Sequence, residues 1–159
     1  MRPLHRLRMV VASLLLGLAA PALQGADVPD DVPQDCHPVY GRALTLLREF
    51  DAGLSPKDRS LARRVVDQGA SQGRAAPQAY EYLGAAAALR GNYAIALWAS
   101  LNAGRQAWRS ATVTNIGVYL FYLGRLDEAE RFLNCARKMN PRSPYALEAL
   151  AMIALKRKN

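Results

Sequence analysis

The stretch that decides the fold is NIGVYLFYLGRLDEAERFLNCARKMNP, which runs from Asn115 to Pro141. Apolar residues recur in it at intervals of three and four, the spacing of one face of an α-helix. Gly124 interrupts the pattern and Pro141 ends it, because both residue types disfavour a helix interior. The stretch is therefore predicted to form two helices joined by a short turn, and it contains nothing that indicates a catalyst.

The same unit recurs along the chain. A shift of 33 residues aligns 77–109 with 110–141, and a further shift of 34 aligns the helix after 110 with that after 144. Matching side chains stand at equivalent positions. The clearest pairs are Tyr80 with Val113, Leu83 with Ile116, Gly84 with Gly117, Gly91 with Gly124, Tyr93 with Leu126, Ala96 with Ala129, and Ala103 with Ala136.

Two of the recurring residues predict how the helices pack. Gly84 and Gly117 fall in mid-helix, where glycine costs about 1 kcal/mol relative to alanine. We expect another helix to pass close to each of them. Ala96 and Ala129 are the small residues on the facing helix that would allow this approach.

The repeat resembles the tetratricopeptide repeat, a helix-turn-helix unit of about 34 residues. The unit 110–141 matches each step of that family's pattern, and 77–109 departs from it at Ala87, Ser100 and Trp108. The resemblance implies an all-α solenoid of stacked antiparallel helix pairs with about seven helices. The expected pairs are 39–72, 77–109 and 110–141, followed by a capping helix at 144–157, and 39–72 matches only loosely. The residues that match in 110–141 are Val113, Ile116, Gly117, Leu120, Gly124, Leu126, Ala129, Leu133, Ala136 and Pro141.

The first residues have the pattern of a secretory signal peptide. A basic start, MRPLHRLR, precedes an apolar run from Met9 to Ala20 and a small-x-small site. We expect residues 1–22 to be removed, with the cut after Ala22 or Ala26, and the mature protein to be periplasmic without stable membrane insertion. The alternative is an uncleaved N-terminal anchor facing the periplasm. Residues 23–38, rich in acids and prolines, are predicted to be a disordered leader before a helical domain at 39–159.

Charge and cysteine content restrict the partners. The net charge of +8 falls to +5 without residues 1–22, which hold three Arg and no acid. The remaining basic residues are scattered, so nucleic acid is not an expected partner. Cys36 and Cys135 could form a disulfide in an exported protein. The alternative is a small buried Cys135 and a free thiol at Cys36, and the sequence leaves this open, as it does the oligomeric state.

No enzyme chemistry is predicted. After residue 22, His37 is the single histidine, so neither a catalytic triad nor a metal-ligand set can be built, and no phosphate-binding loop is present. We therefore expect no cofactor, no metal and no enzymatic activity. The acids Asp127, Glu128 and Glu130 lie in the first turn of a helix, where they complement its dipole.

The resemblance instead implies binding on the concave face, which the first helix of each pair lines. The predicted function is a periplasmic or secreted scaffold that binds a protein or peptide segment there, and the alternative is a module for an anionic glycan or lipid. The carboxylate clamp of some family members has no counterpart in this chain. The expected contact residues are Gln78, Glu81, Tyr82, Ala85, Ala88, Thr114, Asn115, Val118, Phe121, Tyr122, Glu148 and Met152.

Overall fold

A computed structural model describes residues 28–159, which form an all-helical fold with no strand. The all-α prediction is confirmed. The predicted signal peptide and residues 23–27 lie outside the described part of the chain. After a short 3-10 helix at Gln34–Cys36 come seven α-helices: α1 (His37–Gly53), α2 (Pro56–Ser71), α3 (Ala76–Leu89), α4 (Tyr93–Gln106), α5 (Ser110–Tyr122), α6 (Leu126–Met139) and α7 (Pro144–Lys158).

Local sequence signals set the helix ends. The Ser55 hydroxyl accepts a hydrogen bond from the Asp58 backbone N–H at 3.0 Å, which caps α2. The Asn92 side chain caps α4 in the same way. Gly91 and Gly124 have φ of 72° and 79°, and these left-handed residues end α3 and α5 at equivalent points of the two units.

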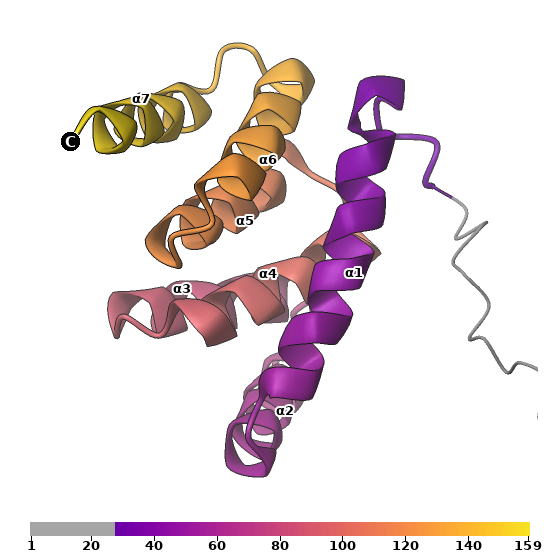
Figure 1. The fold of residues 1–159 in the computed structure, drawn as a ribbon. Helices are drawn as coiled ribbons and strands as arrows, with labels where there is room; N and C mark the ends of the chain where they lie inside the picture. Colours follow the sequence, from indigo (N-terminus) through magenta and orange to yellow (C-terminus); the bar gives the residue numbers. More distant parts are fainter. Residues whose placement is uncertain (1–27) are drawn as a thin grey trace, which may run out of the picture.

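Helices α2 to α7 stack in chain order. Each packs against its neighbours in sequence, and the closest pairs are α3 with α4 and α5 with α6 (Figure 1). The short turns make these pairs antiparallel, because they reverse the chain within a few residues. The arrangement is an α-solenoid, as the 33- to 34-residue repeat predicts.

The two mid-helix glycines lie where the repeat places them. A Cβ added at Gly84 would lie 3.3 Å from the Ala96 carbonyl oxygen of α4. One added at Gly117 would lie 3.2 Å from the Ala129 carbonyl oxygen of α6 and 2.6 Å from Leu133 Cγ. In both units the missing side chain lets the backbones of the paired helices approach each other.

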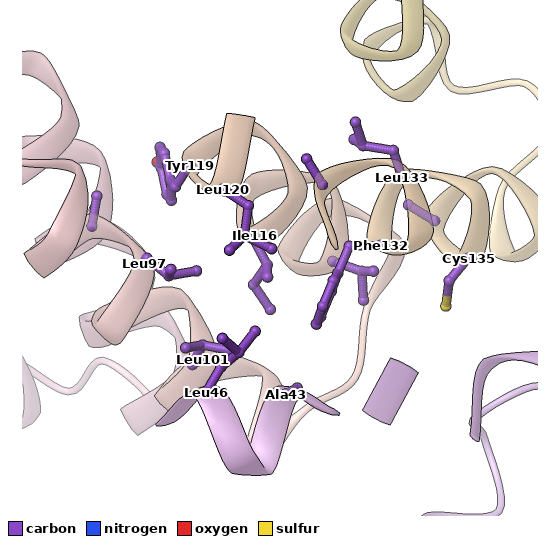
Figure 2. Packing of buried hydrophobic residues seen from close by; sticks show 14 of the residues in the cluster. Ala43, Leu46, Leu97, Leu101, Ile116, Tyr119, Leu120, Phe132, Leu133 and Cys135 are labelled. Carbon is purple, nitrogen blue, oxygen red and sulfur yellow. The ribbon is translucent and has the colours of Figure 1, made fainter. Parts of the chain in front are cut away.

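The first helix does not belong to the stack. The predicted pair 39–72 is wrong as a packed hairpin, because α1 does not pack along α2 but lies across α4 and reaches α6 (Figure 1). Ala43 and Leu46 of α1 are buried in the same cluster as Leu101 of α4 and Phe132 of α6 (Figure 2). The apolar stripe of α1 therefore covers the outer side of the solenoid.

The N-terminal boundary of the ordered fold also differs from the prediction. Residues 28–38 were expected to be disordered, but Val32 and Cys36 are buried, and the His37 imidazole donates a hydrogen bond to the Val32 carbonyl at 3.1 Å. Cys36 forms a disulfide with Cys135 of α6, with a Cα–Cα distance of 5.5 Å. The bridge that the sequence left open thus holds this segment against the domain.

Candidate functional site

We call the exposed sides of α3, α5 and α7 the inner face. It is the side of these helices that neither α4 nor α6 covers, and α1 packs on α4 and α6 instead. On α3, Gln78 and Ala85 are exposed and Tyr82 is 61% exposed. On α5, Tyr122 is 48% exposed, and residues of intermediate burial stand beside it. Those on α5 are Asn115, Val118 and Phe121, and Ala88 of α3 and Met152 of α7 are also intermediate.

Three polar positions of the predicted set behave differently from one another. Thr114 is buried and its hydroxyl donates to the Ser110 carbonyl at 2.8 Å, so its assignment to the binding face is wrong. Glu81 is engaged within the fold, because Arg109 and Thr112 donate to its carboxylate at 2.6 and 2.7 Å. Glu148, at the equivalent place in α7, is exposed. At Glu81 this register position points toward α5 of the next unit rather than to the inner face.

The structure adds two apolar residues that sequence reasoning missed. Leu89 on α3 is 90% exposed and stands 33 positions before Tyr122. Tyr145 on α7 is 70% exposed and stands 34 positions after Ala111, an exposed residue of α5. The repeat register held the signal for both, since each is equivalent to an exposed residue of α5.

Aromatic rings gather at one end of the inner face. The Tyr122 ring stacks on that of Tyr93, with centroids 4.4 Å apart and planes 7° from parallel. Phe121 meets Tyr122 edge to face at 5.3 Å. Tyr82 of α3 has a cationic neighbour, because the guanidinium of Arg74, just before this helix, lies 4.8 Å from the centroid of the exposed Tyr82 ring. Such rings offer rigid apolar area at a small cost in side-chain entropy.

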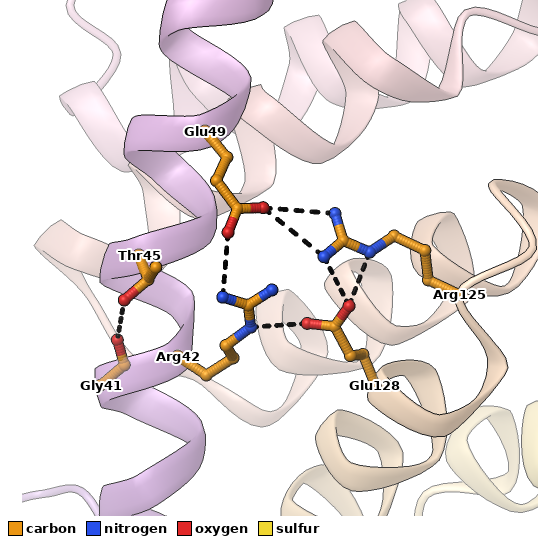
Figure 3. A network of polar contacts seen from close by, with 6 residues as sticks. All are labelled: Gly41, Arg42, Thr45, Glu49, Arg125 and Glu128. Atoms are coloured by element: carbon orange, nitrogen blue, oxygen red, sulfur yellow. Dashed lines mark hydrogen bonds and ion pairs between the residues drawn. The ribbon is translucent and has the colours of Figure 1, made fainter.

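The outer side is closed by α1 through charges as well as apolar packing. Arg42 of α1 donates to Glu128 at 2.6 Å and pairs with Glu49 at 3.0 Å, and Arg125 bridges the same two carboxylates (Figure 3). Burial opposes ionisation of Glu128, but the hydrogen bonds from Arg42 and Arg125 outweigh it and lower the pKa of this carboxyl. The four charges thus join α1 to the beginning of α6.

At the other end of α6 the attachment is covalent. Beside the Cys36–Cys135 bridge, Lys138 donates to Asp35 at 2.8 Å, and this bond lowers the pKa of the Asp35 carboxyl. Residues 28–36 therefore do not occupy the inner face, because they lie against the C-terminal half of α6 and the start of α1.

Across residues 28–159, no three His, Cys, Asp or Glu side chains are placed to bind one metal ion. Nor is any helix between Val28 and Asn159 long and apolar enough to cross a bilayer.

Comparisons with known proteins give no assignment. No protein-family model matches the chain, and no curated protein and no solved structure matches it.

Proposed function

We propose that this chain is a protein-interaction scaffold of the tetratricopeptide type that binds a segment of another protein on its inner face. The observation that carries the proposal is the contrast between the two sides of the solenoid. On the outer side α1 covers α4 and part of α6 with apolar packing, whereas the inner face leaves Tyr82, Leu89 and Tyr122 exposed. Exposed apolar side chains of this kind are typical of interaction sites.

The expected occupant is an apolar or amphipathic segment, such as a helix laid in a groove. Ala85 and Val118 are smaller side chains on the same helices as Tyr82 and Tyr122, so we expect a bulky side chain of the partner to pack against them. This function needs no cofactor, metal or catalytic group. Nucleic acid is not part of the proposal, because the basic residues are scattered over the sequence.

Action outside the cytoplasm is part of the same proposal. The disulfide between Cys36 and Cys135 supports it, since such bonds persist in oxidising compartments such as the periplasm. The signal-like N-terminus supports it independently. The scaffold would then help to assemble or hold a complex of the cell envelope.

A photo-crosslinking amino acid placed on each side tests the proposal. A crosslinker at Tyr82 should capture a protein partner in envelope extract, whereas one at Arg131, exposed on α6, should not. Replacing the neighbouring Leu89 by Arg should reduce capture at position 82 at least about tenfold, because a buried charge is costly. Equal capture from both positions, or none from position 82, would refute the proposal.

A second candidate is binding of an anionic glycan or lipid. It is favoured by the position of Arg74, whose guanidinium lies over the Tyr82 ring and could bind an anionic group of a ligand that packs on this ring. Binding to anionic vesicles or sulfated oligosaccharides should then weaken as salt is raised and should be lost in Arg74→Gln. Salt-independent binding would argue for the protein partner instead.

A further inference from the structure

α7 exposes a face that is covered in the two helices equivalent to it. With the shift of 34 residues, Leu147 of α7 corresponds to Val113 of α5, and Ala151 corresponds to Gly117. Val113 is fully buried, whereas Leu147 is 46% exposed and Ala151 is also exposed. The difference has a simple cause, because α6 covers that side of α5 and no described helix covers the same side of α7.

The exposed face is apolar along three turns of the helix. Leu147, Ala151 and Ala154 lie at intervals of four and three, and Leu155 beside them is 62% exposed. The end of a repeat stack stays soluble through a polar outer face or through a partner that covers it. α7 is the last described helix of the stack, and a further helix can reach the side that carries these apolar residues (Figure 1).

From this geometry we infer that α7 is a docking site for one amphipathic helix of a partner protein, bound antiparallel to it. The two complete units give the template. The incoming helix takes the place that α6 has on α5, with a small residue opposite Ala151 as Ala129 lies opposite Gly117. Ala154 stands where α5 has the larger Leu120, so the partner presents a large apolar side chain there.

Charge adds a second requirement for the occupant. The last turn of α7 carries Lys156, Arg157 and Lys158, and within residues 28–159 only Arg157 among them is ion-paired. Its partners, Asp127 and Glu130, lie at the beginning of α6, which packs antiparallel to α7 on the other side. Lys158 stands seven positions after Ala151 and so lies on the same side of α7, where a second antiparallel helix would begin. An acidic first turn on that helix would satisfy both Lys158 and its own dipole.

The inference concerns a face separate from the inner face and stands without the proposed function. The probe is a labelled peptide of residues 125–140 with Cys135→Ser, which is the chain's own version of the required helix. Fluorescence anisotropy with the full chain should show saturable binding. Ala151→Arg should weaken it at least about tenfold, because the charge would be buried at the closest approach. Ala70→Arg, at an exposed alanine of α2, should leave the binding unchanged.

The controls separate folding and self-association from docking. Ala151 is exposed, so Ala151→Arg should melt at the temperature of the wild type, and a peptide with Ala129→Arg should not bind. Peptide binding that Ala151→Arg leaves intact, or no saturable binding by the wild type, would overturn the inference. It would also be overturned by a dimer in sedimentation velocity that Ala151→Arg converts to a monomer, because a second copy would then cover α7.

Discussion

α4 and α6 hold equivalent places in the two repeated units, yet their outer sides differ. Every residue of α4 from Ala96 to Gly104 is buried. α6 buries a single stripe and exposes Arg131 and Arg137. The cause lies outside the repeat, because α1 lies across α4 and touches α6 only in part. The repeat determines the contacts within each unit, and a helix outside the repeat determines what covers them.

Residues of the first unit that depart from the repeat pattern lie where α4 packs against its neighbours. Trp98 and Trp108 have no counterpart in α6 and its following turn, and both meet α1. The Trp98 indole donates to Asp51 at 3.2 Å, and the Trp108 ring packs edge to face on Tyr40 at 5.0 Å. Ser100, where a large apolar residue is usual, lies within reach of a Cβ at Gly84. The two tryptophans therefore contact α1, and Ser100 contacts α3, so that α4 is packed on both sides.

Removing the disulfide should have the largest effect on stability and on the difference between α4 and α6. The double substitution Cys36→Ala and Cys135→Ala should lower the free energy of unfolding by about 2–5 kcal/mol, since the bridge closes a long loop. Hydrogen exchange should rise in α1 and α4 and stay nearly constant between α5 and the α6 residues facing it. Unchanged denaturant midpoints, or an equal rise in both units, would show that α1 is not what encloses α4.

Replacing each of the two mid-helix glycines by alanine should destabilise the two units to different extents. Gly117→Ala should cost about 1–3 kcal/mol, because its Cβ would overlap Leu133. Gly84→Ala should cost clearly less, because its nearest contacts are at 3.3 Å and the gain in helix propensity is about 1 kcal/mol. Thermal melts of both variants provide the measurement. Equal losses of stability would contradict the tighter packing around Gly117 than around Gly84.

The two tryptophans allow a smaller, matched test of the contact with α1. Trp98→Phe removes a hydrogen bond to Asp51, whereas Trp108→Phe removes a buried indole N–H that has no partner within residues 28–159. Both lose similar volume, so Trp98→Phe should cost about 1 kcal/mol more. Urea unfolding of the pair measures the difference. A larger cost for Trp108→Phe would contradict this assignment.

The charge network should contribute least and in a pH-dependent way. The folded pKa of Glu128 lies below its ordinary value of 4.5, so its stabilising effect is present above that pH and is lost as the pH falls through the folded pKa. Glu128→Gln should cost about 1 kcal/mol at pH 7. Its stability should approach that of the wild type in acid. Glu148→Gln, on the exposed side of α7, is the matched control and should show no such convergence.

The sequence predicted the repeated part of this fold well. Gly84 and Gly117 carried a packing signal because glycine in mid-helix is unfavourable without a close neighbour, and the structure has that neighbour in both places. Gly91 and Gly124 located the turns for an equally local reason. The ranges 77–109 and 110–141 each hold one pair of helices, and the predicted helix 144–157 corresponds to α7.

The position of α1 could not be predicted in the same way. Its apolar stripe shows that it packs, but periodicity does not say against which helix. The choice depends on Trp98, Glu128 and Cys135, which lie 47 to 99 positions from their α1-side partners. The exposure of Leu89 could have been found from the repeat register, whereas the burial of Thr114 depends on how the helices pack, which the pattern of a single helix does not reveal.

The bridge between Cys36 and Cys135 has a consequence for cleavage of the chain. It closes a covalent ring with 99 positions between its ends, and every turn from α1 to α6 lies within that ring. A protease that cuts any one of these turns produces two pieces that stay joined until a thiol reductant is added. On a gel without reductant, the nicked protein therefore keeps its full mass.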